Sequence, residues 1–318
     1  MAHNHTHYGE EIGGRLLLIA LLLNVGIAGA QVVGGLLAGS LALLADAAHN
    51  LSDAAALGIS YVARKIALRA PDQRRTFGYA RVETVAALFN LTALIIIGIY
   101  LLIEAITRLF NPVEVQGTTM LIVGGIAFAE DLLSTIILAR GAKESLNIRS
   151  SMLHLAADTL STVAVILGAV AVIIWNLTWI DPALTILISV FILGYAVREL
   201  RSATSILIES APKGFDLHGA VHAIEHVPGV LDAHHIHLWY LDEHRIALEA
   251  HIVMDRADLS EIERVKHEVK QVLRDRFGIE HTTLEVEIEA DIEHERSIIP
   301  KREARPSGHH GPSTEHDH

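Results

Sequence analysis

The sequence of 318 residues contains no cysteine, and this absence removes several classes of site at once. Disulfides, thiolate metal sites and cysteine nucleophiles are all excluded, so any bound metal ion must be held by imidazole and carboxylate groups. Those groups are abundant, since the chain has 20 histidines and 37 aspartates and glutamates. The net charge of -12 argues against nucleic acid as a partner, because nucleic-acid binding needs a basic surface.

Charged residues are scarce as well, at 19% of the chain, while hydrophobic residues make up 51% and the mean hydropathy is +0.38. The apolar residues are gathered in long runs, whereas a soluble domain mixes apolar and polar residues at short period. We therefore predict an α-helical membrane protein with one small soluble domain. Six runs of about 20 residues have the length of a bilayer-spanning helix: Leu16–Ala38, Ser40–Val62, Thr84–Ile103, Met120–Ala139, Met152–Trp175 and Trp179–Val197.

The loops between these runs predict how the chain crosses the membrane. Arginine and lysine residues lie in the loops after the second and fourth runs and directly after the sixth, whereas Asn111–Gly117 and Asn176–Asp181 contain none. The positive-inside rule therefore places both chain ends and the basic loops in the cytoplasm. The first run lacks a small-residue cleavage pattern, so we expect it to be kept as a span and not removed as a signal peptide.

From about residue 210 the sequence becomes mixed and charged. We expect helices at Asp216–His226 and Leu259–Arg276, and strands at Leu231–Leu241, Arg245–Met254 and His281–Glu289. The order α-β-β-α-β predicts a small α+β domain with its helices on one face of a sheet. The expected parts are a histidine-bearing tail (1–11), the membrane domain (12–209), the soluble domain (210–292) and a disordered histidine-bearing tail (293–318).

Two matching pairs of polar residues stand inside the apolar runs. They are His49 with Asp53 in the second run and His154 with Asp158 in the fifth. A separation of four residues returns to nearly the same helix face, so each helix presents one imidazole and one carboxylate side by side. Buried carboxylates are costly in a bilayer unless they are paired, solvated or bound to a cation. Two such helices facing each other would offer two nitrogens and two oxygens, a set suited to tetrahedral zinc.

A single histidine or aspartate inside a membrane can also be a hydrogen bond between packed helices, but two pairs of the same composition argue against that explanation. Asp46 lies one turn before His49, and Asn50 is adjacent to His49. These two residues could line an access path or hold His49 through a hydrogen bond. For Asp46, simple packing between helices is an equal alternative.

At five places the sequence resembles the cation diffusion facilitators, a family of proton-coupled exporters of zinc and related metals. The motifs are SLALLADAAHNLSD (40–53), PDQRRTFGYARVE (71–83), HLAAD (154–158), HHIHLW (234–239) and HTTLEVE (281–287). They occur in the family's order, and the resemblance covers about residues 12–290. It implies six spans, a ferredoxin-like cytoplasmic domain and a homodimer. We expect the protein in a bacterial inner (plasma) membrane, with both termini cytoplasmic.

The transport site that the resemblance implies consists of His49, Asp53, His154 and Asp158. A histidine at the first of these positions is the version associated with zinc, and sometimes with cadmium or cobalt. The sequence departs from the family at Glu130 and Asp131, in the fourth run, where many members carry uncharged residues. These acids could form a proton relay, widen the polar cavity or weaken zinc selectivity. Adjacent residues point about 100° apart on a helix, so the two cannot both face one site.

In the soluble domain, the resemblance implies a regulatory metal site at the contact between two copies. Its candidate ligands are His234, His251, Glu285 and Glu287, with His237 as a further candidate. Strand alternation places His251 and the two glutamates opposite to the apolar residues of their strands, so they share polar faces. Surface histidines are commonly just solvated, and this alternative stays open.

These features favour a carrier in which zinc, the transported substrate, competes with protons for the same ligands. Metal loading releases protons, and protons arriving from outside expel the metal, so an inward proton gradient drives export. Histidine suits this role because its unperturbed pKa of about 6.5 is close to the working pH. Imidazole and carboxylate ligands do not distinguish zinc from cadmium, cobalt or nickel.

Two other classes of protein are alternatives, an intramembrane metal-dependent hydrolase and a metal-gated channel or sensor. The chain has no His-Glu-x-x-His motif, and a hydrolase should leave one ligand position to water beside a general base. A two-plus-two ligand set closes the metal's shell instead. We therefore expect a transporter and not an enzyme, with saturable proton-coupled flux as the property that separates it from a channel or sensor.

Overall fold

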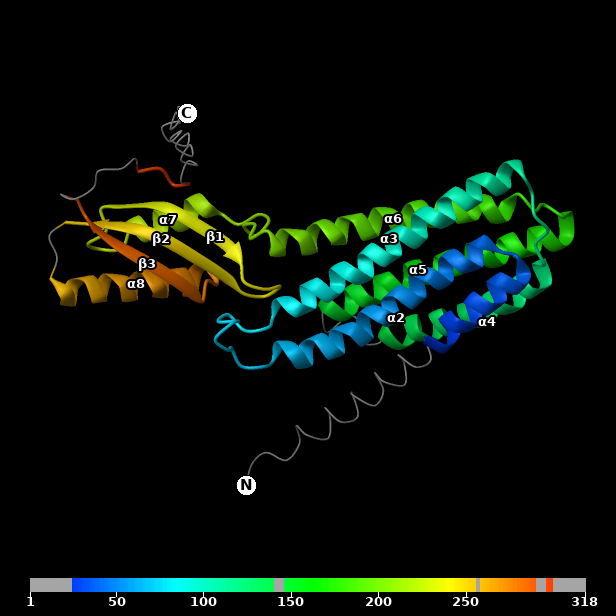
Figure 1. Ribbon diagram of the computed structural model, residues 1–318, viewed down its shortest axis with the longest axis horizontal. Helices are drawn as coiled ribbons and strands as arrows, with labels where there is room; N and C mark the ends of the chain where they lie inside the picture. The colour runs from blue at the N-terminus through cyan, green and yellow to red at the C-terminus, as the bar shows by residue number, and fades with distance from the viewer. Residues whose placement is uncertain (1–24, 140–145, 256–257, 290–295, 300–318) are drawn as a thin grey trace, which may run out of the picture. The chain divides into compact units, whose positions relative to one another are not determined.

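The computed structural model describes residues 25–139, 146–255, 258–289 and 296–299. They fall into two compact units, with the division between Leu207 and Ile208. The first unit is helical, and the second contains helices and a small sheet (Figure 1). A helical domain followed by a small α+β domain is the arrangement that the sequence predicts.

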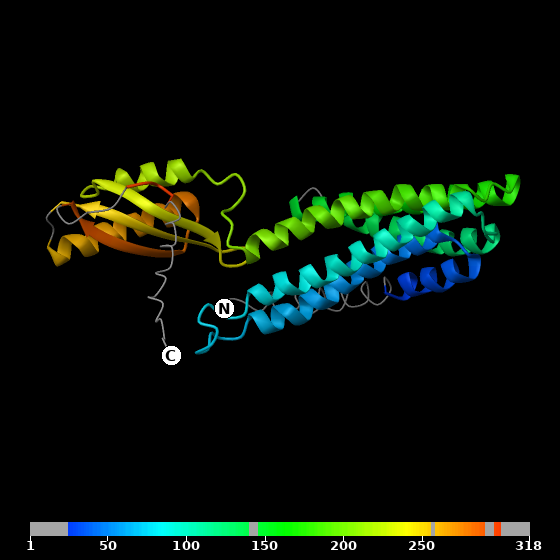
Figure 2. The same ribbon diagram turned by 45° about the horizontal axis from the view of Figure 1, so that its top comes forward.

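The described part of the first unit is built from helices: Val25–Ala38, α2 (Leu41–Ala67), α3 (Arg81–Phe110), α4 (Gly117–Ala139), α5 (Leu146–Trp175) and α6 (Ile180–Leu207). Helix α3 packs along α6, α4 packs along α5, and α2 lies against α3 (Figures 1 and 2). Several helices continue past the apolar runs, because charged residues such as Arg64 and Lys65 end a hydrophobic run without ending a helix. The part of the first predicted run before Val25 lies outside the described residues.

Among the described residues, four helical segments are long and apolar enough to cross a membrane: Arg81–Phe110, Gly117–Ile136, Asp158–Trp175 and Ile180–Leu207. The described part of the first helix is apolar but shorter. Helix α2 has 27 residues, but several polar residues between Asp46 and Asp53 lower its average hydropathy. Large apolar side chains such as Phe89 and Phe110 of α3 are exposed, as expected of a surface that faces lipid.

A tight hairpin joins the first helix to α2 at Gly39. Gly39 has a φ of 68°, which glycine adopts without strain, and a Cβ atom here would lie 3.0 Å from the carbonyl oxygen of Glu114. Arg108 of α3 donates from Nη1 to the Gly39 carbonyl oxygen at 2.6 Å. The turn is thus held by its own backbone conformation and by a neighbouring helix.

Asp181, in the first turn of α6, caps the N-terminus of α2. Its carboxylate accepts from the Ser40 hydroxyl at 2.5 Å and from the backbone N–H groups of Leu41 and Ala42 at 2.9 and 3.2 Å. Asp181 is fully buried. The first N–H groups of a helix have no partners inside the helix, and the helix dipole favours a negative charge beside them. Asp181 therefore anchors the start of α2 to α6.

The second unit has the element order α7 (Leu217–Glu225), β1 (Asp232–Tyr240), β2 (Ile246–Met254), α8 (Leu259–Phe277) and β3 (His281–Ile288). This confirms the predicted α-β-β-α-β order. Strands β1 and β2 are antiparallel, β2 and β3 are parallel, and β2 lies in the centre of the three-stranded sheet. Helix α7 begins at Asp216, whose side chain accepts from the Gly219 N–H at 2.8 Å.

Both helices of this unit pack on one face of the sheet. Ile224 of α7 and Leu273 of α8 share a buried apolar cluster with Leu248, Ala250 and Ile252 of β2. Because side chains alternate along a strand, the residues between these core positions point to the opposite face. The sheet therefore has one apolar face under the helices and one face free for polar groups.

A short segment beyond β3 returns to the outer edge of β1. The backbone N–H groups of His235 and Ile236 donate to the carbonyl oxygens of Ser297 and Ile298 at 3.0 and 2.7 Å. Ile298 also packs against the apolar cluster. Part of the β1 edge is therefore paired.

We expect Asp181→Ala to destabilise the helical unit by about 1–3 kcal/mol, because the buried donors at the start of α2 lose their acceptor. The measurement is the thermal unfolding midpoint of the purified protein in detergent, which should fall. Asp181→Asn keeps one acceptor oxygen and is the matched control, with a smaller fall expected. An unchanged midpoint for Asp181→Ala would show that this contact does not stabilise α2.

Candidate metal centres

His49, Asp53 and Asp158 come together between α2 and α5. The Nε2 atom of His49 lies 3.1 Å from Oδ1 of Asp158 and 3.7 Å from Oδ2 of Asp53. One ligand atom from each residue lies within 4.8 Å of the other two. His49 and Asp158 are buried, whereas Asp53 is partly exposed. One imidazole nitrogen and two carboxylate oxygens at these separations suit a single divalent ion.

Helical spacing explains how these side chains meet. His49 and Asp53 are one turn apart on α2, and Asp158 projects from α5, which contacts α2. The expected fourth ligand, His154, lies on α5 one turn before Asp158. The side chain of His154 is outside the described part of the chain.

Gln31 of the first helix joins the two polar residues that flank His49. It is fully buried, its Nε2 donates to Oδ2 of Asp46 at 2.6 Å, and its Oε1 accepts from Nδ2 of Asn50 at 3.0 Å. Oδ1 of Asp46 also accepts from the Ser161 hydroxyl of α5 at 3.2 Å. Asp46 and Asn50 therefore tie α2 to the first helix and to α5, beside the His49 group.

Asp131 and Glu130 of α4 make contacts in different directions, as helical geometry requires. The Thr162 hydroxyl donates to Oδ2 of Asp131 at 2.7 Å and lies 3.5 Å from Oδ2 of Asp46. Glu130 instead accepts from the Ser134 hydroxyl on its own helix at 3.1 Å. Asp131 thus joins the buried polar network around Asp46, whereas the hydrogen bond between Ser134 and Glu130 lies within α4.

Several neighbours of the His49 group were not singled out by the sequence. Gln31 carries a weak signal, as one of two amides, with Asn24, in the otherwise apolar first run. Ser161 and Thr162 follow Asp158 at three and four residues, the spacing that shares its helix face. Tyr195 of α6 meets the His49 ring edge-on, with the ring centroids 6.4 Å apart. A tyrosine in an apolar span carries no signal of its own.

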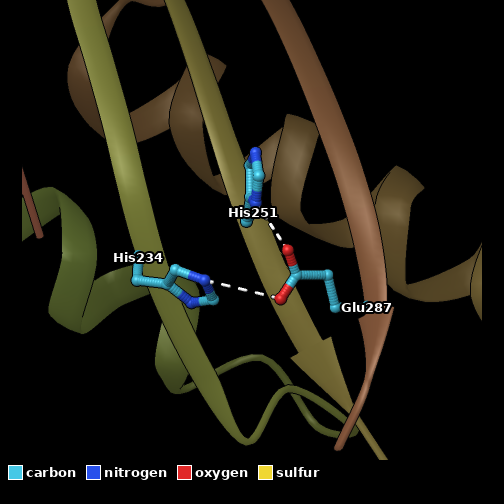
Figure 3. Close-up of side chains that lie close together, drawn as sticks. All are labelled: His234, His251 and Glu287. Atoms are coloured by element: carbon cyan, nitrogen blue, oxygen red, sulfur yellow. Dashed lines mark hydrogen bonds and ion pairs between the residues drawn. The ribbon is translucent and has the colours of Figure 1, made fainter. Parts of the chain in front are cut away.

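His234, His251 and Glu287 form a second group, on the sheet of the second unit (Figure 3). Oε1 of Glu287 lies 2.6 Å from Nδ1 of His251, and Oε2 lies 3.4 Å from Nε2 of His234. The three residues come from three strands, and His234 is directly paired with His251. They lie on the face turned away from α7 and α8 (Figure 3). His234 is only 1% exposed.

The other candidate residues of the second unit are placed differently. Oε2 of Glu285 lies 3.4 Å from Nε2 of His251, on its exposed side. A β-bulge shifts the register between His234 and His237, and among the described residues His237 is not part of the group. His235 has a φ of 50° at this bulge and stacks on the His251 ring, with centroids 4.4 Å apart. Regular alternation predicts the opposite face for His235, which is why the sequence did not indicate it.

Both units match models of known protein families. Residues 17–208 match the cation efflux transmembrane domain, and residues 212–289 match the cytoplasmic domain of cation efflux proteins. Apolar helices beside a cluster of side chains that can bind metal, with a second such cluster on the sheet of the second unit, fit a multi-pass membrane transporter of cations. The chain belongs to the cation efflux family, which is the family of cation diffusion facilitators.

Full-length relatives support this assignment. The chain is 34% identical to the cadmium, cobalt and zinc/H(+)-K(+) antiporter of Bacillus velezensis, over 98% of this chain and 99% of that protein. It is 38% identical to the metal cation efflux system protein CzcD of Cupriavidus metallidurans, over 90% of each. It is 35% identical to the zinc transporter ZitB of Escherichia coli, over 90% and 93%.

One solved structure is also similar, the metal-bound C-terminal domain of the CzcD transporter from Cupriavidus metallidurans. It is 39% identical to this chain, over 23% of this chain and 97% of that domain, with a TM-score of 0.21. The family and the full-length relatives make the protein a transporter and not an enzyme, so the intramembrane hydrolase is rejected.

We expect Gln31→Leu to reduce cation transport by about tenfold or more, because Asp46 and Asn50 lose the side chain that orients them beside His49. The measurement is the initial rate of metal uptake by proteoliposomes. Gln116→Leu makes the same change at an exposed position at the start of α4 and should leave the rate unchanged. Transport at the parental rate by Gln31→Leu would show that Gln31 does not position the group.

Proposed function

We propose that this protein exports divalent transition-metal ions from the cytoplasm in exchange for protons, with zinc as the preferred substrate. The observation that carries the proposal is the close approach of His49, Asp53 and Asp158 between two helices of the membrane unit. It is supported by relatives named as transporters of zinc, cadmium and cobalt, one of which is named as a proton antiporter.

In this proposal His154 is the fourth ligand of the transported ion. Each of α2 and α5 would then supply one neutral imidazole and one ionised carboxylate. Two nitrogens and two oxygens fit the tetrahedral coordination of zinc, while magnesium and calcium prefer six or more oxygen ligands. The mixed donor set therefore favours borderline transition-metal ions over the more abundant hard cations.

Proton coupling follows from competition for these ligands. The buried imidazole of His49 lies within 3.7 Å of two carboxylates, so a cation is favoured there, either a metal ion or a proton. Zinc needs deprotonated ligands, and its binding therefore displaces protons. When the ligands face the outside, protonation releases the metal, and when they face the cytoplasm, zinc replaces the protons.

We further propose how the chain crosses the membrane. The first helix and α2 both cross the bilayer with α3 to α6, which makes six spans with both chain ends in the cytoplasm of a bacterial cell. The polar residues of α2 do not argue against a span, because Asp46, His49 and Asn50 are buried inside the helical unit and so need not face lipid. Residues 12–209 then form the membrane domain, and residues 210–292 form a ferredoxin-like cytoplasmic domain through which two copies pair.

We also propose that His234, His251 and Glu287 bind a regulatory zinc ion. Two imidazoles and one carboxylate converge on this site from three strands, and the partly buried carboxylate of Glu287 contacts both rings. Glu285 lies on the exposed side of His251 and completes the set of carboxylates near it. A cation there would balance the negative charge of the Glu285 and Glu287 carboxylates, which lie close together on the sheet.

We expect Asp53→Ala and Asp158→Ala each to reduce zinc flux about 100-fold or more, because each removes a ligand of the transported ion. The measurement is zinc uptake into proteoliposomes, with cadmium, cobalt and nickel assayed in parallel. Glu104→Gln removes a carboxylate that pairs with Arg108 on α3, away from the His49 group, and is the control. Flux at the parental rate in either alanine variant would refute the assigned site.

A pH gradient should drive zinc transport. Proteoliposomes with the cytoplasmic domain outward and an acidic lumen should accumulate zinc, about tenfold per pH unit for each proton exchanged, because one pH unit is worth about 1.4 kcal/mol per proton. A protonophore should abolish the accumulation. The initial rate should saturate with zinc concentration, as for a carrier. Equal zinc uptake with and without the gradient would contradict proton exchange, and an unsaturable rate would favour a channel.

We expect the double change His234→Ala and His251→Ala to lower the number of tightly bound zinc ions by about one per chain. The measurement is metal content after dialysis of the purified full-length protein. His267→Ala removes an exposed histidine of α8 and should leave the metal content unchanged. Equal zinc content in the parent and in the double variant would show that this group does not bind metal tightly.

A further inference from the structure

We propose that His222 and His226 of the second unit form a third site for transition-metal ions, separate from the His49 and His234 groups. Both residues are exposed, one turn apart, at the C-terminal end of α7. The opposite side of α7 is buried through Ala220, Val221 and Ile224. The packing of that apolar side fixes the rotation of the helix and directs both imidazoles to solvent.

The two rings are already close to each other. Their centroids are 4.0 Å apart, and the ring planes make an angle of 26°. Histidines at positions i and i+4 of a helix share a face, so their ring nitrogens can reach one ion. Because His222 is exposed, rotation about its side-chain bonds can turn a ring nitrogen toward Nε2 of His226.

The His226 ring is held in the form that a metal ion needs. Its Nδ1 lies 2.7 Å from the backbone carbonyl oxygen of His222. A carbonyl oxygen only accepts hydrogen bonds, so Nδ1 carries the hydrogen and, in the neutral ring, Nε2 keeps its lone pair. Histidines that bind metal ions commonly make this contact through their other nitrogen, because it fixes both the tautomer and the direction of the ring.

The end of the helix adds electrostatic support for a cation. His226 is the residue that ends α7, and its backbone N–H bonds to the carbonyl oxygen of His222. The last carbonyl groups of a helix carry partial negative charge, which favours a positive ion nearby. Glu225, between the two histidines in sequence, adds a carboxylate on the same part of the helix. His218, one turn earlier, is also exposed.

Two imidazoles completed by water suit zinc, nickel and copper(II), and they suit magnesium and calcium poorly. Such a site binds more weakly than one with a buried carboxylate, so its ion exchanges readily with solution. It lies on a helix that packs on the opposite face of the sheet from His234, His251 and Glu287. Its occupancy should therefore not depend on the ligands of that group.

The test is site-resolved chemical modification of the full-length protein in detergent. Diethyl pyrocarbonate acylates unbound imidazole nitrogens, and mass spectrometry of the peptides gives a rate for each histidine. Zinc or nickel ions should slow the modification of His222 and His226 at least fivefold, with the same concentration dependence for both. His267 is the matched control, since it is exposed on α8 with no histidine one turn away, and its rate should not change.

Variants distinguish a shared ion from separate effects. In His222→Gln, His226 should lose its protection, and in His226→Gln, His222 should lose its own. Both should stay protected when His234 and His251 are replaced by alanine. Modification of His222 and His226 at the same rate with and without metal would overturn the proposal. Protection of one histidine that survives replacement of the other would overturn it as well.

Discussion

Buried carboxylates are the constraint on which the membrane unit depends. Four aspartates are buried in this unit, whose outer surface is largely apolar: Asp46, Asp131, Asp158 and Asp181 are 2%, 4%, 6% and 0% exposed. A charge in such surroundings needs a partner, and each of these aspartates has one. Their partners come from other helices, so the pairing of charges also determines how the helices are arranged.

The four aspartates of the helical unit differ in the kind of partner that contacts them. Asp181 is satisfied by backbone and hydroxyl donors at the start of α2, and its role is to anchor a helix end. Asp158 is satisfied by the ring of His49, which can equally bind a metal ion. Asp46 and Asp131 lie between these cases, joined through Thr162. Fixed contacts at the helix end thus stand beside exchangeable contacts near its middle.

The sequence could predict the elements, and some of the side chains that lie together, because both depend on spacing. Paired residues four apart placed His49 beside Asp53, and alternation along strands placed His251 on the same face as its glutamates. The role of Gln31 could not be predicted, because it depends on which helix lies opposite. A single amide also forms no repeating pattern that would indicate a helix face. His235 was missed because a β-bulge breaks alternation, and nothing in HHIHLW marks where the bulge falls.

The return of residues 297 and 298 to β1 has a consequence for how the second unit meets other chains. A bare strand edge is a template for pairing with any extended peptide, including another copy of the same sheet. Here the chain occupies part of that edge with its own backbone. Shortening the protein ahead of Ser297 would uncover these donors and create a route to aggregation through strand addition, even though every element of the domain would still be present.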